Sequence, residues 1–167
     1  MSTFVSIGNG HQPFTRLLDA VDAIADSLPQ PVIVQHGHTP FSSTRCTAIA
    51  FMPMEDFVAH MGSARLVIIH AGVGSILSAW RAGGLPIVVP RLAAMNEHID
   101  DHQLDLARAL ASVGRVALVE DTVNLGTAVL DAAAHQCAAP ATRTDIPLVA
   151  MVKRILSDVH SHNRATA

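Results

Sequence analysis

The sequence has few of the residues that mark secreted, nucleic-acid-binding or membrane-spanning proteins. Only two of its 167 residues are cysteines, Cys46 and Cys137, and they match no metal-ligand spacing. We therefore interpret both as reduced thiols of a cytoplasmic protein. Tyrosine is absent, aromatic residues make up 4% of the chain, and the formal net charge is −3. These values argue against base stacking and against bulk electrostatic binding of nucleic acid.

Long hydrophobic runs and targeting signals are also missing. Hydrophobic residues make up 50% of the chain, yet no run approaches the roughly 18 apolar residues of a membrane span. The first ten residues contain neither the basic region nor the apolar stretch of a signal peptide. The hydrophobic content excludes a disordered chain, so we expect one globular domain.

Short apolar segments alternate with segments of helical periodicity along the chain. The expected strands are rich in Val and Ile and cover residues 4–7, 32–35, 48–51, 66–69, 86–89 and 116–119. The expected helices cover residues 14–28, 55–61, 76–82, 100–113 and 123–134. Strands that are apolar on both faces suit a parallel sheet covered by helices. The pattern therefore predicts an α/β fold with a single Rossmann-like, doubly wound parallel sheet.

This expected domain occupies residues 1–137. Residues 138–147 are rich in Ala, Pro and Thr and are typical of a hinge, and residues 148–160 are predicted to form a last helix. The apolar residues of that helix form a broad stripe made of Leu148, Val149, Met151, Val152, Ile155, Leu156 and Val159. Such a stripe suits either docking to a partner or packing against the chain's own sheet.

Glycine and polar residues follow several of the expected strands. Gly8, Asn9 and His11 come after the first strand, residues 70–75 follow the fourth, and Arg91 begins a polar stretch after the fifth. Because the carboxyl ends of parallel strands meet at one edge of the sheet, ligands of such folds bind there. We therefore expect these residues to gather around a ligand site.

Residues 66–83, LVIIHAGVGSILSAWRAG, carry the strongest local pattern, in which a buried strand leads through a glycine turn into a helix. Gly72 and Gly74 leave the backbone open to a ligand, and Ser75 can either cap the helix or bond a phosphate oxygen. The free N–H groups at a helix start favour an anion. The same pattern also fits a tight turn that binds nothing. The third glycine of the dinucleotide fingerprint and the P-loop motif are both absent.

Two longer segments, HAGVGSILSAWRAGGLPIVVPR (residues 70–91) and NEHIDDHQLDLARAL (96–110), resemble the C-terminal, donor-binding domain of glycosyltransferase family 28. The segment FVSIGNGHQPFTRLLDAVD (4–22) resembles the opening of the stand-alone members of this family. Those members are the cytosolic subunit of the transferase that adds the second GlcNAc to dolichol-diphosphate-GlcNAc, and the corresponding subunit of bacterial exopolysaccharide synthesis. The resemblance covers residues 4–118 and implies the donor-binding half of a GT-B glycosyltransferase.

The resemblance also implies a UDP-sugar donor and catalysis that needs no metal or other cofactor. The residues that it places at the donor diphosphate are Gly8, Asn9, Gly72, Gly74 and Ser75. The residues that it places near the sugar hydroxyls are Asn96, His98, Asp101, His102 and Gln103. A membrane-anchored, acceptor-binding subunit is implied as a partner. It would bring a lipid-diphosphate-linked sugar acceptor to this chain at the cytoplasmic face of the membrane.

Three positions in these motifs have more than one interpretation. Relatives such as the lipid II transferase hold the ribose with a Glu where this sequence has Ser78, which cannot make a bidentate carboxylate contact. His70 is either a hydrogen-bonded strand end or a donor contact. Arg91 either adds positive charge at the diphosphate or pairs with a carboxylate. The base that deprotonates the acceptor is not identified, since His11 is only a candidate and the partner could supply the base.

Two other functions fit the sequence. The first is a metal-dependent hydrolase that uses His98 and His102, which are four residues apart and could share a helix face. The second is a non-catalytic, nucleotide-binding regulatory subunit, in line with the serine at position 78. The preferred prediction is the donor-binding, catalytic subunit of a two-component glycosyltransferase in exopolysaccharide or glycolipid synthesis.

Overall fold

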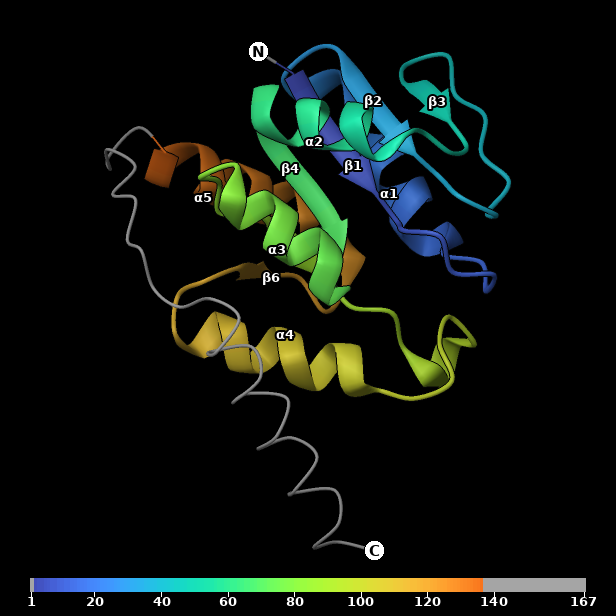
Figure 1. Ribbon diagram of the computed structural model, residues 1–167, viewed down its shortest axis with the longest axis vertical. Helices are drawn as coiled ribbons and strands as arrows, with labels where there is room; N and C mark the ends of the chain where they lie inside the picture. Colours follow the sequence, from blue (N-terminus) through green and yellow to red (C-terminus); the bar gives the residue numbers. More distant parts are fainter. Residues whose placement is uncertain (1, 137–167) are drawn as a thin grey trace, which may run out of the picture.

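Six parallel strands form a single sheet in the computed structural model, which describes residues 2–136 (Figure 1). The strands are β1 (Ser2–Ser6), β2 (Val32–Gln35), β3 (Thr47–Ile49), β4 (Ala64–His70), β5 (Ile87–Val89) and β6 (Ala117–Leu118). All six expected strands are thus present, with ends that differ by a few residues. The expected hinge at residues 138–147 and the expected last helix at 148–160 lie outside the described residues.

Within residues 2–136, four α-helices connect strands and a fifth follows β6, as the periodicity predicts. They are α1 (Thr15–Ile24), α2 (Met54–Ser63), α3 (Val73–Arg81), α4 (His102–Ser112) and α5 (Leu125–Gln136). Three short 3-10 turns accompany them, namely η1 (Ala25–Ser27), η2 (Ala93–Met95) and η3 (Thr122–Asn124). Helix α3 begins three residues earlier than expected, and α4 begins two residues later. Among the described helices, none is long and apolar enough to cross a membrane.

The helices cover both faces of the sheet, because successive strand residues point to opposite sides (Figure 1). Val5 of β1 packs in the core layer that α1 and α5 cover, which includes Leu17 and Leu125. Phe4, one residue earlier, packs in the opposite layer with Ile76 of α3 and other residues of α2, α3 and α4. Strands that are apolar on both faces are therefore explained by two buried layers.

The strand order β3-β2-β1-β4-β5-β6 contains a switch in direction at its centre. From β1 the chain proceeds outward through β2 and β3, then returns to place β4 on the other side of β1 and continues through β5 and β6. This is the doubly wound Rossmann order, in which ligands bind in the crevice outside the carboxyl ends of the strands at the switch point. The predicted fold class is confirmed, and the order directs attention to the ends of β1 and β4.

Candidate functional site

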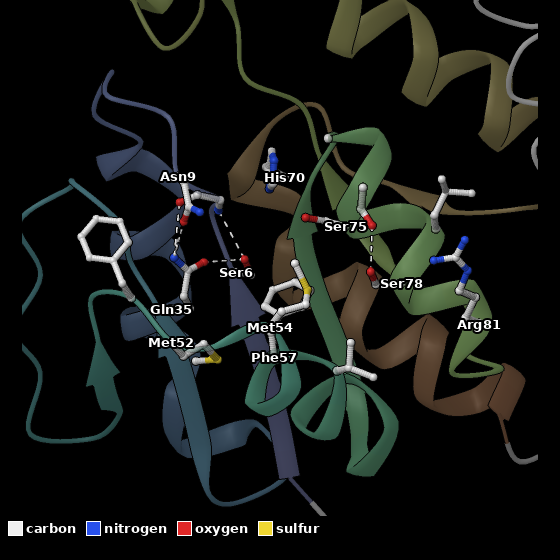
Figure 2. A pocket seen from close by; sticks show the side chains of 16 residues that line it. Ser6, Asn9, Gln35, Met52, Met54, Phe57, His70, Ser75, Ser78 and Arg81 are labelled. Atoms are coloured by element: carbon white, nitrogen blue, oxygen red, sulfur yellow. Dashed lines mark hydrogen bonds between the residues drawn. The ribbon is translucent and has the colours of Figure 1, made fainter.

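A pocket of about 670 Å³ opens beside the carboxyl ends of β1 and β4 (Figure 2). Its lining comes from β1 and the following loop, the end of β2, the segment leading through α2, the end of β4, and α3. The lining residues are Ser6, Gly8, Asn9, Gln35, Phe51, Met52, Met54, Phe57, Val58, His70, Gly72, Gly74, Ser75, Leu77, Ser78 and Arg81. The volume falls within the roughly 300–1,000 Å³ of small-molecule sites.

A hydrogen-bond network holds the loop after β1 at the pocket (Figure 2). Gln35 donates through Nε2 to Oδ1 of Asn9 at 3.2 Å and to the carbonyl of Ala50 at 3.1 Å. Its Oε1 accepts from the Ser6 hydroxyl at 2.6 Å, and the Ser6 oxygen accepts from the N–H of Gly8 at 3.3 Å. Both Gln35 and Ser6 are buried. Since a buried polar group without a partner costs about 1–3 kcal/mol, this network fixes how Gly8 and Asn9 face the pocket.

His70 ends β4, and its ring fills the space between two glycines. A Cβ atom on Gly8, where φ is +76°, would lie 2.5 Å from Cε1 of the ring, and a Cβ atom on Gly72 would collide with Nε2. Only glycine permits this close approach of backbone and ring at both positions. Part of the space that we expected Gly72 to leave for a ligand therefore accommodates the chain's own histidine.

The imidazole of His70 is neutral and incompletely hydrogen-bonded. Its Nδ1 atom is buried and makes no hydrogen bond to any residue between 2 and 136. Burial disfavours the charged ring and the guanidinium of Arg91 repels it; these effects outweigh the nearby backbone of Ser6, which favours the charged ring, and lower the pKa of His70 to about 4. A buried polar atom without a partner is rare in folded proteins. His70 thus offers the pocket a hydrogen-bonding group without charge.

Helix α3 begins at the pocket with Gly72 as its N-cap. A glycine cap has no side chain that could accept hydrogen bonds from the first-turn N–H groups, and Gly74 and Ser75 of this turn line the pocket. A Cβ atom on Gly74 would have no neighbour within 4 Å in the described part of the chain. The fold therefore does not need a glycine at position 74. An anion that approaches the positive end of the helix does need one, because a side chain there would occupy its space.

The opposite wall of the pocket is apolar and was not identified from the sequence. It consists of Phe51, Met52, Met54, Phe57 and Val58, from α2 and the segment before it. Residues 54, 57, 58 and 61 have the spacing of one helix face, yet only Met61 among them is fully buried. The large exposed fractions of Met54 (71%) and Val58 (52%) show that this stripe is wider than the core requires.

Two polar residues continue the pocket along α3 (Figure 2). Ser78 donates its hydroxyl hydrogen to the carbonyl of Gly74 at 2.9 Å, so only its oxygen lone pairs can meet a ligand. Arg81 follows three residues later on the same helix face and adds a cation to the lining. The sequence analysis did not single out Arg81, although its spacing from Ser78 was a usable signal.

Arg91 joins the loop after β1 to the loop after β5. Its side chain is 2% exposed in the fold, and its guanidinium donates to the carbonyl oxygens of Ile7 (2.9 Å), Gln12 (2.7 Å) and Glu97 (3.1 Å). The carboxylate of Glu97 accepts two hydrogen bonds from Arg16, each of 2.9 Å. These contacts are all within the chain, and Arg91 is not part of the pocket lining.

The residues that follow Arg91 are held in a similar way. The side-chain oxygen of Gln103, which is buried, accepts from the backbone N–H of Arg91 at 3.2 Å. The carboxylate of Asp101 accepts from the N–H of Ala93 at 2.9 Å. Asn96 has a φ of +56°, a left-handed conformation that asparagine tolerates better than most residues. Loop geometry is thus one physical reason for these residue types.

The remaining candidates are histidines at the surface. His98 and His102 both contact Oδ1 of Asp100 at the start of α4. His11 stacks on His38 with ring centroids 4.2 Å apart, and the ring of His38 meets Phe51, at the pocket, edge-on at 4.9 Å. His11 therefore lies close to the pocket rim without lining the pocket.

Half of the expected donor-binding residues meet in one place. The pocket brings together Gly8, Asn9, His70, Gly72, Gly74 and Ser75. The residues that it does not include are Arg91, Asn96, His98, Asp101, His102 and Gln103. The glycine-turn motif and the loop after β1 therefore form a common site, while the loop after β5 is a separate structural unit beside it.

Comparison with known proteins gives one family match and one curated relative. The model of the glycosyltransferase family 28 C-terminal domain matches residues 4–158. The UDP-N-acetylglucosamine transferase subunit ALG13 of Yarrowia lipolytica is 38% identical over 72 residues, which cover 43% of this chain and 35% of the relative. The matched region thus spans about a third of that relative.

Several solved glycosyltransferases have the same fold. The glycotransferase of kitacinnamycin superposes with a TM-score of 0.62 at 19% identity, over 98% of this chain and 39% of that one. CalG4, the calicheamicin glycosyltransferase, superposes with a TM-score of 0.59 at 20% identity, over 96% of this chain and 38% of its own. At these identities the likeness establishes a shared fold and no more.

Proposed function

We propose that this chain, which belongs to the glycosyltransferase family 28 C-terminal domains, is the donor-binding, catalytic subunit of a two-component glycosyltransferase. In this proposal it transfers a sugar from a UDP-sugar to a lipid-diphosphate-linked acceptor, in exopolysaccharide or glycolipid synthesis. The observation that carries the proposal is the pocket at the switch point, where the start of α3 faces the loop after β1.

The two walls of the pocket suit the two parts of a nucleotide diphosphate. The first turn of α3, with Gly74 and Ser75, presents N–H groups and the positive end of a helix dipole to the diphosphate. The apolar wall, with Phe51 and Phe57, offers a surface for the flat uracil ring. Arg81 adds a positive charge on the same side as Ser78, and its side chain is long and flexible enough to approach a bound diphosphate.

The same arrangement supports the chemistry of sugar transfer. The bond between the anomeric carbon and the diphosphate oxygen breaks, and negative charge grows on the departing UDP. Preorganised N–H groups stabilise that charge, and each hydrogen bond to a charged group contributes about 1.5–3 kcal/mol. His70 can donate or accept one hydrogen bond here, but its low pKa excludes a role as a counter-charge. The acceptor hydroxyl forms the new bond to the anomeric carbon and gives its proton to a base.

We place the sugar between the pocket and the loop that follows β5. Asn96, His98 and His102 are exposed or half-buried there and can reach sugar hydroxyls. Arg91 and Gln103 support this loop from beneath, since their polar atoms bond to the chain itself. His11, stacked at the pocket rim, remains the candidate base within this chain, and the second subunit is the other possible source.

We propose that a membrane-anchored second subunit supplies the acceptor half of the enzyme. The Yarrowia relative is named as a subunit of a transferase, which supports this arrangement. The solved transferases are more than twice as long as their region of likeness to this chain. A partner of this kind would recruit the chain from the cytoplasm to the cytoplasmic face of the membrane.

Donor binding is tested by isothermal titration of the purified chain with UDP, GDP, ATP and NAD. We expect UDP to bind most tightly, because the family match and the UDP-N-acetylglucosamine transferase subunit of Yarrowia support a UDP-sugar donor. Tighter binding of ATP or NAD than of UDP would overturn the proposed donor.

Partner dependence is tested with a radiolabelled UDP-sugar in two reactions. One contains the purified chain with purified lipid acceptor, and the other contains the chain with membranes of the producing cell. Holding both substrates in near-attack geometry lowers a barrier by about 7–11 kcal/mol, so we expect turnover only with membranes. Rapid turnover by the chain alone contradicts the two-component proposal. UDP binding without transfer in either reaction favours a regulatory subunit instead.

A further inference from the structure

The side chains of His98, Asp100 and His102 form a cluster where the loop after β5 meets the start of α4. Nδ1 of His98 lies 3.1 Å from Oδ1 of Asp100, and Nδ1 of His102 contacts the same oxygen atom. The two rings are nearly perpendicular, at 87°, with centroids 4.7 Å apart. The rings therefore converge on one carboxylate oxygen and do not stack. This cluster lies outside the pocket lining and outside the contacts of Arg91.

Two imidazoles and one carboxylate are a donor set for divalent transition metals. One ring nitrogen of each histidine and a carboxylate oxygen of Asp100 all lie within 4.8 Å of one another. Zinc bonds to nitrogen and oxygen ligands are about 2.0–2.2 Å long, so the ligand atoms of a zinc site lie about 3–4 Å apart. A bound ion would replace the hydrogen bonds within the cluster and draw the three atoms to that spacing through rotation of the side chains. We propose that His98, Asp100 and His102 bind one Zn²⁺-type ion at the start of α4.

The charge of the surrounding chain favours a cation. Between Arg91 and Arg108 the sequence has four carboxylates and no lysine or arginine. Only Glu97 among these four is paired with an arginine, Arg16. The side chain of Asp100 is 51% exposed, which leaves its carboxylate accessible to an ion from solvent.

The identity of the donor atoms selects the class of ion. Imidazole nitrogen suits zinc and its transition-metal neighbours, whereas Mg²⁺ and Ca²⁺ prefer oxygen ligands. The exposed position of Asp100 and His102 leaves further coordination positions open to water or to an oxygen atom of a bound ligand. The ion would join residues 98–100 to the first turn of α4 and so restrain the loop between β5 and α4. This assignment gives His98 and His102 a role other than the sugar contact proposed above, and it can be tested without any donor.

The site is tested by titrating the full, untagged chain with Zn²⁺ and with Mg²⁺. The variants are His98→Ala, His102→Ala and Asp100→Asn, the last of which keeps the shape of the side chain but removes its charge. The matched control is His38→Ala, which removes an exposed imidazole from the stacked pair with His11. Circular dichroism and thermal unfolding in the absence of metal confirm that each variant folds, as expected for partly exposed positions.

We expect the parent chain to bind one equivalent of Zn²⁺ more tightly than Mg²⁺, and Zn²⁺ to raise its Tm. Loss of an outer-shell partner alone weakens metal binding about 10- to 100-fold, so loss of a ligand in any of the three variants should weaken it at least as much. His38→Ala should bind like the parent. Three results would overturn the proposal: equal zinc binding by the His102→Ala variant and the parent, loss of binding in His38→Ala, or a preference for Mg²⁺. The UDP titration is read separately, so failure here leaves the donor proposal unaffected.

Discussion

Two regions at the carboxyl edge of the sheet use their polar groups in opposite ways. At the start of α3 and in the loop after β1, small residues leave backbone N–H groups facing a pocket, and a buried nitrogen of His70 has no partner among the described residues. In the loop after β5, the side chains of Arg91 and Glu97 are almost fully buried and bonded to the chain itself. The first region leaves polar groups unbonded beside a pocket, and the second uses its polar groups to hold the chain together.

The rigid region also supports the open one. Arg91 reaches across the sheet edge to the carbonyl oxygens of Ile7 and Gln12, which lie on either side of Gly8 and Asn9. The segment after β5 resembles a sugar-binding segment of the family. It thus contributes to the pocket partly because its residue Arg91 holds the backbone of the loop after β1. Sites are commonly made precise by such supporting contacts. At neutral pH, substitutions in the two regions should therefore differ in kind, with losses of stability in the loop after β5 and losses of binding at the pocket.

The largest expected effect is on stability, from Glu97→Ala. This change leaves Arg16 without its carboxylate and the N–H of Leu92 without its acceptor. Removing one partner of a buried ion pair costs about 3–5 kcal/mol of unfolding free energy. The control is Glu120→Ala, which breaks the exposed pair with Arg108 and should cost about 1 kcal/mol or less. Urea unfolding measures both, and equal losses would show that the loop after β5 is not a rigid support.

The second effect is on the pH dependence of stability and belongs to the open region. The folded chain holds the pKa of His70 at about 4, while an unfolded chain binds that proton near pH 6.5. The unfolded state therefore binds more protons between these values, and stability falls as the pH falls through this window. We expect the parent to lose about 2 kcal/mol more than His70→Asn between pH 7 and pH 5. Urea unfolding at both pH values tests this, and parallel losses in the two proteins would contradict it.

The contrast between the two regions also explains which features could be predicted from sequence. The strands and helices followed from apolar runs, because Val and Ile on both faces of a strand have no other stable environment than a covered sheet. The motif at Gly72 and Gly74 was found because glycine next to a helix start has a specific geometric meaning. The edge of the sheet where a ligand is expected, at the carboxyl ends of the strands, followed from the topology alone.

The features that escaped sequence reasoning depend on tertiary contacts. Arg91 was a candidate for the diphosphate, yet no local pattern shows that its guanidinium meets the carbonyl of Ile7, 84 positions away. The ring of His70 between Gly8 and Gly72 requires two distant segments to be in place. The apolar wall at Met54 and Val58 was not identified, because a helix stripe does not reveal how much of it the sheet covers.

A smaller effect is expected on donor binding, from Gly74→Val. A side chain at position 74 meets no atom within 4 Å in the described residues, so the fold should tolerate it, but it would occupy space at the pocket. The matched control is Gly62→Val in α2, which also has free space and does not line the pocket. We expect UDP affinity to fall at least about tenfold, or about 1.4 kcal/mol, in Gly74→Val only. Unchanged UDP binding in calorimetry would mean that the turn is merely structural.

The smallest effect is expected from Ser78→Ala, which tests whether the ribose uses this position. The hydroxyl of Ser78 already donates to the carbonyl of Gly74, so it can only accept a hydrogen bond from a ribose hydroxyl. One neutral hydrogen bond contributes about 0.5–1.5 kcal/mol, and this site is partly open to solvent, so a loss of UDP affinity near the lower value is expected. Ser112→Ala is the control, because Ser112 makes a similar bond to its own helix, in α4, and does not line the pocket. Calorimetry that finds the two variants equal would place the ribose away from Ser78. A loss above tenfold would show that Ser78 does more than accept one hydrogen bond, and that the serine replaces the family's glutamate more fully than its chemistry suggests.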